Sequence, residues 1–333
     1  MKKRNVYKRF IAKIKSACKA RRIPKSFSKK NNNVFSNSKH MTMYGLMKKE
    51  KKDYRDMPDF LELLKNEIGL PRIPHFTTLN KFALRVKPLW FDALIDEIIS
   101  SVETEEMVMC SIDGTGLSLN SRSKYFETIV GQRKLFLQCN LCYENKHRLI
   151  LAYKFRRKRR HESIDFQRLA KRACEKRKVS CFLQDKAFDA EKHHKFARYE
   201  LKSELIAPLR KKGKKVGGFY RKQMKKLPTI YKKRASISEN GHSVLKGKYG
   251  EIIYAKKFKT QKIEAIGKVL AYNTEKVINL NYVVLLSTED IASTFCFSNS
   301  VFLNVLSVAF FTDYFLFHTI CPLCILFLRY ISI

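Results

Sequence analysis

The chain has 333 residues, enough to bury a sizeable core and to form about two domains. It carries 68 Lys and Arg against 30 Asp and Glu, a formal net charge of +38 at pH 7. Such a charge favours a polyanionic partner, and nucleic acid is the first to expect. The nine cysteines are odd in number and scattered, so a disulfide scaffold is not expected and a reducing, cytoplasmic compartment is indicated.

The first segment, residues 1–52, contains 18 Lys or Arg, one acid (Glu50) and no sustained apolar period. We expect a basic, flexible arm that contacts DNA phosphates, although a solvated basic leader would have the same composition. No long apolar stretch follows the first basic residues, so a secretory signal peptide is not expected.

In residues 53–104, unlike the first segment, apolar residues recur at helical spacing. This spacing predicts a helical N-terminal subdomain. Its first helix should begin near Met57 and end at Gly69, a plausible C-terminal cap. A second helix should start at a cap formed by Thr77 or Thr78 and stop before Pro88, and a third should follow it.

The apolar run of residues 107–116 predicts a buried strand that delivers Asp113 to its C-terminal end, just before a glycine. Residues 179–189 repeat the pattern, with Asp185 closing the second apolar run. Either aspartate alone could be an ordinary turn residue. Because a buried carboxylate needs a partner or a metal ion, two strand-end aspartates together indicate a functional site.

Between these strands, residues 135–143 and 147–155 predict two more strands joined by a tight turn, and residues 163–176 predict a helix. Three successive strands suggest an antiparallel meander. The strand that follows the helical crossover should lie parallel to the first. This order predicts a mixed sheet that brings Asp113 and Asp185 together.

A third acid, Glu239, belongs to a predicted helix in which positions 239, 243 and 246 share one face. Two strand aspartates and one helix glutamate can supply the oxygen ligands that a pair of Mg²⁺ ions requires. Residues 210–234, just before this helix, hold 12 Lys or Arg and no acid. They are expected to contact a phosphate backbone, and a disordered basic loop is the alternative.

At these residues the sequence resembles the DDE transposases of bacterial and archaeal insertion sequences. The segments Ile-Asp-Gly-Thr around Asp113 and Gln-Asp-Lys-Ala-Phe-Asp around Asp185 are similar to the two aspartate strands of that family. Tyr231, Arg234, Glu239 and Lys246 match its Tyr-Arg-Glu-Lys signature in type and order. One gap departs: four residues separate Arg234 from Glu239, where the family has three, and one extra helical residue means a rotation of about 100°.

The resemblance implies a ribonuclease-H-like α/β fold, a mixed sheet with flanking helices, over a DDE catalytic domain at residues 105–275. It also implies Mg²⁺-dependent strand cleavage and strand transfer at the ends of an insertion sequence, with two ions for which Mn²⁺ can substitute. The partners would be double-stranded DNA, as terminal inverted repeats and as target, and a second copy of the chain in a homodimer. The catalytic metal ligands implied are Asp113, Asp185 and Glu239, and the DNA-binding residues are Tyr231, Arg234, Lys246, Lys186, Arg210, Lys211 and Lys212.

Other interpretations remain open. A ribonuclease-H-like nuclease of another kind would share the carboxylates. The displaced glutamate, together with Gly241 and Gly247 in its helix, is also compatible with a catalytically decayed DNA-binding relic. Cys139 and Cys142 lack a second pair for zinc, and His161, His193 and His194 are expected at the solvated surface rather than on a metal.

The last segment, residues 276–333, is rich in Phe, Leu and Cys. Its two apolar runs, residues 301–311 and 314–328, are each shorter than the roughly 20 residues of a comfortable membrane span. We therefore consider a membrane helix, not favoured, beside a packed or aggregating extension and translation past the normal frame of the gene.

Overall fold

A computed structural model describes residues 2–28, 34–102, 104, 106–119, 136–210 and 216–280. One compact unit extends over Met1–Leu280, and residues 281–333 form a second unit that lies outside the described residues. The expectations for the C-terminal runs therefore fall outside the described part of the chain. Among the described residues, no helix combines the length and the apolar character needed to cross a membrane.

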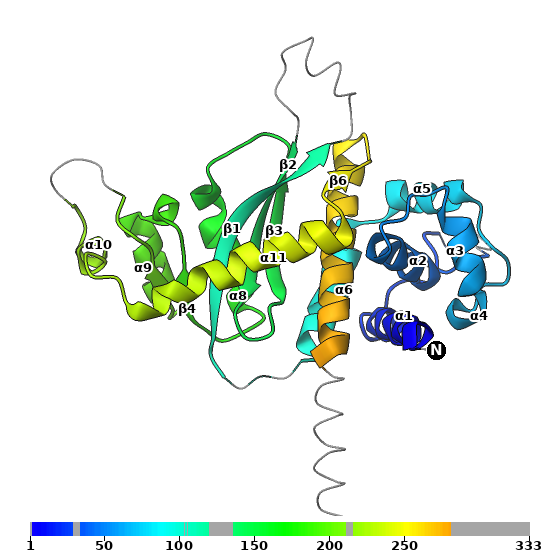
Figure 1. Cartoon of the computed structure of the whole chain (residues 1–333), viewed down its shortest axis with the longest axis horizontal. Helices are drawn as coiled ribbons and strands as arrows, with labels where there is room; N and C mark the ends of the chain where they lie inside the picture. The colour runs from blue at the N-terminus through cyan, green and yellow to red at the C-terminus, as the bar shows by residue number, and fades with distance from the viewer. Residues whose placement is uncertain are drawn as a thin grey trace, which may run out of the picture. The chain divides into compact units, whose positions relative to one another are not determined.

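A six-stranded mixed sheet forms the centre of the first unit, with the order β3-β2-β1-β4-β5 and β6 paired to β1 (Figure 1). The strands are β1 (Val108–Leu119), β2 (Phe136–Glu144), β3 (Ile150–Arg156), β4 (Val179–Leu183), β5 (Glu204–Ile206) and β6 (Ile252–Ile253). β1, β2 and β3 are antiparallel, whereas β4 and β5 continue the sheet in parallel from β1. The predicted meander and the parallel fourth strand are confirmed, and this order is that of the ribonuclease-H-like fold.

β1 differs from its prediction in length. It does not end at Asp113 but continues to Leu119, because β2 pairs with it as far as Ser118 and β6 pairs with Ser118 and Leu119. Asp113 consequently lies in the middle of a strand, opposite Leu141 of β2. Its backbone is fixed on that side by a regular ladder.

Helices cover the sheet and connect its strands. The short helix η1 (Glu162–Asp165) leads into α8 (Phe166–Cys174), and η2 (Lys186–Phe188) leads into α9 (Glu191–Tyr199). α10 (Phe219–Gln223) and η3 (Thr229–Lys232) precede α11 (Lys233–Tyr249), which crosses one face of the sheet in Figure 1. A further helix covers residues 258–280.

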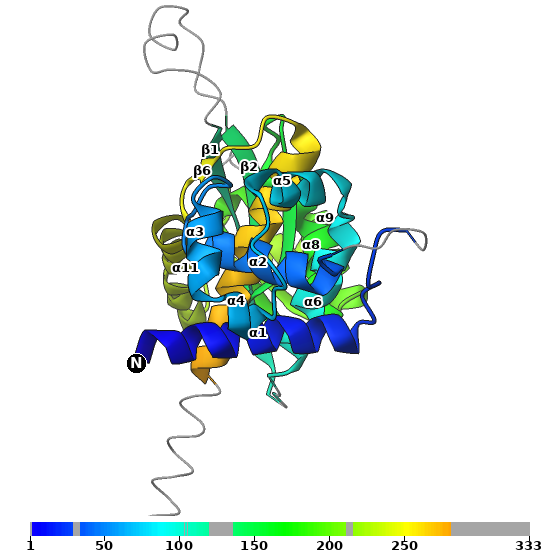
Figure 2. The same ribbon diagram turned by 90° about the vertical axis from the view of Figure 1, so that its right-hand side faces the viewer.

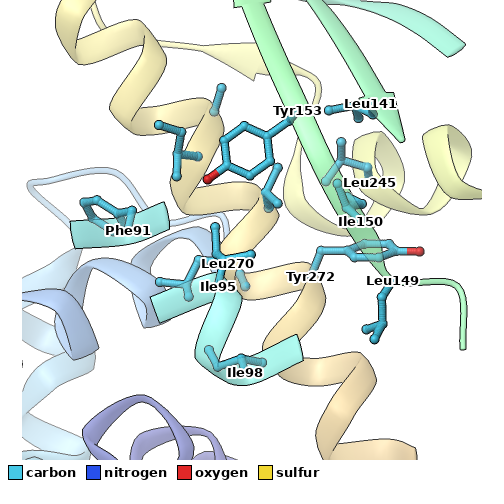
Figure 3. Packing of buried hydrophobic residues seen from close by; sticks show 14 of the residues in the cluster. Phe91, Ile95, Ile98, Leu141, Leu149, Ile150, Tyr153, Leu245, Leu270 and Tyr272 are labelled. Carbon is cyan, nitrogen blue, oxygen red and sulfur yellow. The ribbon is translucent and has the colours of Figure 1, made fainter. Parts of the chain in front are cut away.

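The helix over residues 258–280 forms part of the main hydrophobic core. Figure 3 shows its Leu270 beside Ile95 of α6 (Pro88–Ser100) and its Tyr272 beside Ile150 of β3. All of these side chains are buried. Asn273 of the same helix adds a polar contact with β3. Its side-chain amide accepts from the Ile150 N–H and donates to the Ile150 carbonyl, both at 2.9 Å.

The expectation of a flexible arm over residues 1–52 is wrong. This segment forms α1 (Lys2–Ala20) and α2 (Asn37–Lys49), and Figure 2 shows α1 running across α4 (Lys65–Ile68) and α6. Phe10 and Ile14 of α1 are fully buried, one turn apart on the same face. Lys48 of α2 also forms a buried ion pair of 3.0 Å with Glu264 of the helix over residues 258–280. The abundant lysines hide this apolar stripe in the sequence.

The three helices predicted after the arm are present as α3 (Met57–Leu63) with α4, α5 (Phe76–Arg85) and α6. Gly69 does end the first of them, with a left-handed φ of 72°. The predicted threonine cap of α5 is wrong, because His75 occupies the N-cap position and no side chain caps the helix. The ring of His75 instead contacts the Thr77 hydroxyl at 2.9 Å.

His193 and His194 on α9 are buried, contrary to the expectation of a solvated surface. The His193 ring packs edge-on against Phe166, with 5.0 Å between the ring centroids. Burial, with smaller effects from neighbouring positive charges, lowers the pKa of His193 to about 4. His193 is therefore a neutral core residue that joins α9 to α8, and burial also lowers the pKa of His194.

Candidate active site

Asp113 lies within β1, and Asp185 follows the end of β4, the parallel neighbour of β1. The β1–β4 ladder ends with the pair Cys110 and Phe182, and Asp113 and Asp185 each follow three residues later in the sequence. Both side chains are only partly buried. The Asp185 carboxylate accepts a hydrogen bond of 2.6 Å from the N–H of Lys186 and caps η2. The sequence prediction that these two aspartates converge agrees with this register.

Gln184, the residue before Asp185, lies between the end of β4 and the neighbouring strand β1. Its backbone N–H continues the sheet by donating to the Ile206 carbonyl at 2.9 Å. Its side-chain amide takes the place of backbone pairing with β1, where it donates to the Ile112 carbonyl at 2.7 Å and accepts from the Ile112 N–H at 2.9 Å. The regular β1–β4 ladder therefore stops before the two aspartates, and the Gln184 side chain joins β4 to β1 directly before Asp113 and Asp185.

Glu162 is a third carboxylate at this place. It begins η1, which contacts η2 directly after Asp185, and its carboxylate occupies the space that a Cβ atom at Gly114 would need. Burial raises the pKa of Glu162, and the negative charges of Asp113 and Asp185 raise it further, although the Gly114 N–H lowers it. Gly114 is therefore required for a close approach, and the three carboxylates form one electrostatic group.

Two side chains of α11 face Asp113. Arg234 Nη2 and His242 Nε2 each lie 3.8 Å from Asp113 Oδ2. The other ring nitrogen of His242 contacts the hydroxyl of buried Tyr143 on β2 at 3.1 Å. Burial lowers the pKa of His242 to about 4, with Asp113 acting in the opposite direction and Lys246 in the same direction. His242 is therefore neutral at neutral pH, and Arg234 is the cation beside Asp113.

Glu239 does not lie on this face of α11. Arg234, Ser238 and His242 follow one another at intervals of four residues, and Ser238 is fully buried whereas Glu239 is exposed. The extra residue between Arg234 and Glu239 has the effect that the helical geometry requires, a turn of about 100° away from the arginine. Ser238 thus occupies the position that a three-residue gap would have given to the glutamate.

Close packing of α11 on β2 explains the glycine at position 241 without any decay of the gene. A Cβ atom at this position would lie 2.5 Å from Cε1 of Tyr143, so only glycine permits α11 to pack this closely on β2. Gly247 is not constrained in this way, since a Cβ atom there would meet no atom of the described residues within 4 Å.

The remaining predicted DNA-binding residues differ in their position relative to the candidate site. Tyr231 is partly buried, and its pKa is raised by burial and by Asp185 while Arg234 lowers it, which places it beside the candidate site. Lys246 lines a cavity of about 440 Å³ together with Gly114 and Glu162. Lys186 and Arg210 are exposed. Lys211 and Lys212 lie outside the described residues.

Arg210 is nevertheless held in place through its backbone. Its N–H donates to Asp189 Oδ2 at 2.8 Å, and Arg221 donates two further hydrogen bonds of 2.8 Å to the same carboxylate. Burial alone would raise the pKa of Asp189, but these hydrogen bonds lower it overall. Arg210 and Arg221 of the basic segment over residues 210–234 are therefore both fastened to Asp189, directly after η2.

The carboxylates fit a hard divalent cation in their chemistry. Asp113, Asp185 and Glu162 offer oxygen ligands, and a cation would relieve the part of the raised pKa of Glu162 that comes, after burial, from the charges of the two aspartates. In the described ranges, however, no group of three or more His, Cys, Asp or Glu side chains is close enough together to hold an ion. Glu239, as placed, is outside this group.

Sequence reasoning missed Glu162, Gln184, Ser238 and His242. A signal existed for the last two, because they lie four and eight residues after Arg234 and so share its helix face. Gln184 directly precedes Asp185 and could have been questioned as a polar residue in a buried strand. Glu162 carried no local signal, since only the folded chain brings the end of β3 next to Gly114.

Comparisons with known proteins point to one family. The family model described as "Transposase DDE domain" matches residues 105–274, just over half of the chain. The search of curated proteins found no match. One similar solved structure is the cryo-EM structure of a piggyBac transposase synaptic complex with hairpin DNA, at 10% sequence identity, 83% coverage of this chain, 74% coverage of that chain and a TM-score of 0.47. Because the family model spans Asp113, Asp185 and α11, the chain belongs to the DDE transposase family.

Proposed function

We propose that this protein is a DNA transposase that cleaves and rejoins DNA strands at the ends of an insertion sequence. The single observation that carries the proposal is the parallel register of β1 and β4, which places Asp113 and Asp185 three residues after the last paired residues, within the residues matched by the DDE family. Double-stranded DNA would be the substrate, as terminal repeats and as target. Joining two ends requires two active sites, so a homodimer on DNA is part of the proposal.

Asp113 and Asp185 would hold the divalent metal, Mg²⁺ or in its place Mn²⁺. When bound, two such ions lower the pKa of an attacking water and stabilise the leaving oxygen of an in-line phosphoryl transfer. Arg234 and neutral His242 keep Oδ2 of Asp113 between them, which orients this carboxylate. Tyr143 orients His242 in turn. Lys246, on the wall of the neighbouring cavity, would bind a DNA phosphate.

We propose Glu239 as the third ligand, which it becomes when α11 turns about its axis by roughly 100°. The unsatisfied side chains on the inner face of α11 support such a turn. Arg234 Nε, Ser238 Oγ and His242 Nε2 are buried and have no hydrogen-bond partner among the described residues. Buried polar atoms without partners cost free energy, so the binding of metal and DNA can favour a rearranged helix. In the structure as described, the charges of both aspartates act on the Glu162 carboxylate.

The alternative is a catalytically decayed relic that still binds DNA. The observation that favours it is Ser238 in the inward position that the family signature gives to glutamate.

The two functions separate in a cleavage assay with the full chain. A duplex that carries the inverted repeats flanking the gene is incubated with Mg²⁺, with Mn²⁺, or with a chelator. A transposase cuts at the repeat end only when a metal is present. Binding without cleavage under either metal would establish the relic.

A further inference from the structure

The block of basic residues directly after β3 lines a cavity that the proposed active site does not use. This cavity, of about 490 Å³, lies between the edge strand β3, α8 and the helix over residues 258–280. Its walls carry eight Lys or Arg side chains and one carboxylate, that of Asp92. Asp92 is already engaged, because it accepts a hydrogen bond from Tyr153 and lies 3.6 Å from Arg172. The cavity is therefore strongly positive.

Most of these cations have no counter-ion of their own. Arg156 is paired with buried Asp165, and Arg172 with Asp92. The other six make no ion pair with any carboxylate in the described ranges: Lys154, Arg157, Lys158, Arg160, Arg168 and Lys262. Burial lowers the pKa of Lys154, and the charges of Arg168 and Arg156 lower it further, as expected where like charges crowd together. An anion bound here would relieve this repulsion.

The block also connects this cavity to the candidate active site. Arg157, Lys158 and Arg160 line the cavity at β3, whereas Arg159 lines the second cavity together with Gly114 and Glu162. The connecting backbone is fixed, because the Gln138 side chain of β2 accepts from the Arg160 N–H and donates to the Arg160 carbonyl, both at 2.8 Å. The positive charge thus lies on a segment that follows β3 and is anchored to β2 through Arg160, and it continues to the carboxylates.

We infer that residues 156–160, with Arg168 and Lys262, form a track for the phosphate backbone of duplex DNA, leading from the outer edge of β3 to the carboxylates at Gly114. Five residues span at most about 17 Å. Measured along the axis of the duplex, this length corresponds to roughly five phosphates of one strand, at about 3.4 Å of axis for each. Several separate cations in a row suit a repeating anion better than a single phosphate. The inference rests on the proposed function, since it supplies the path of that substrate.

The test compares two charge-matched double variants of the full chain. Arg157→Gln with Arg168→Gln removes two exposed cations of the track from β3 and α8. Lys192→Gln with Lys195→Gln removes two exposed cations from α9, beside β5 at the opposite edge of the sheet. Duplex DNA binding is measured by fluorescence anisotropy over a range of salt concentrations, with a chelator present so that no cleavage occurs.

The expected result is weaker binding by the track variant, with the slope of log K against log salt reduced by about 0.9 for each lost phosphate contact. The α9 variant should keep the wild-type slope. A photo-crosslinking residue placed at position 157 should also capture DNA, whereas one at position 192 should not. Equal slopes for the two variants, or preferential capture at 192, would overturn the inference.

These outcomes are distinct from failure of the proposed function. If the wild-type chain never cleaves DNA but the track variant shows a reduced salt slope, the proposed transposase activity is wrong and the DNA track stands. If the wild-type chain cleaves DNA with Mg²⁺ but the two double variants have the same salt slope, the transposase activity stands and the DNA track is wrong.

Discussion

His242 is a buried residue whose protonation should limit stability in acid. It contacts Tyr143 and faces Asp113, Arg234 and Lys246. Its pKa is lowered to about 4 in the folded chain, against an ordinary value of 6.5. Between these values the unfolded chain binds a proton that the folded chain does not, so stability falls as the pH drops from about 6.5 to about 4.

The prediction is tested with His242→Gln. Urea unfolding at pH 7 and pH 5 should show that the variant loses less stability in acid than the wild type, by up to about 1.4 kcal/mol per pH unit. His193, whose pKa is also about 4, stays in both proteins and contributes equally. An unchanged dependence of the unfolding free energy on pH would contradict the assignment of a neutral, buried His242.

Gly241 and Gly247 should respond in opposite ways to alanine, although both lie in α11. Gly241→Ala forces a methyl group against the Tyr143 ring and should cost about 1–3 kcal/mol of stability, the usual cost of overpacking. Gly247→Ala meets open space and should stabilise the helix by up to about 1 kcal/mol. Thermal unfolding of the two variants provides the comparison. Equal effects would show that α11 does not pack on β2 as described.

At the scale of elements, the rotational register of α11 decides whether the third carboxylate can reach the site. Placing glutamate at the inward position while removing it from the outward one, as in Ser238→Glu with Glu239→Gln, imitates the turned helix. We expect this double variant to cleave DNA with Mg²⁺, and Glu239→Gln alone to be impaired. The matched control, Ser243→Glu with Glu239→Gln, keeps its carboxylate on the exposed face and should remain impaired. Full activity of Glu239→Gln alone would exclude Glu239 as a ligand.

The elements of the sheet were predictable from the sequence, because strands and a crossover helix leave strong local patterns. The end of β1 was not, since the pairing with β6 comes from residues more than 130 positions later. The site was predictable for Asp113 and Asp185, which close apolar runs. Glu162 was not predictable, because its role depends on the absence of a side chain at Gly114 in the folded chain.

At the scale of the whole molecule, the high positive charge is partly structural. The basic residues of the first segment do not all belong to a free arm. Lys48 forms an ion pair with Glu264, and Arg21 forms one of 2.8 Å with Glu97. The composition showed the charge but could not show which cations the fold would use. Six cations that make no ion pair with a described carboxylate line the cavity after β3, and this local concentration of charge favours DNA running over that edge toward the carboxylates.

The most direct test of the central claim is single-turnover cleavage of a repeat-end duplex by Asp113→Asn and Asp185→Asn, in Mg²⁺, beside the wild type. Because each substitution removes a charged oxygen ligand but keeps the size of the side chain, folding and DNA binding should be retained. We predict that each variant cleaves at least about a hundredfold more slowly, equivalent to about 2.7 kcal/mol of transition-state stabilisation. Cleavage at the wild-type rate by either variant would contradict the assignment of these two aspartates as the metal-binding centre.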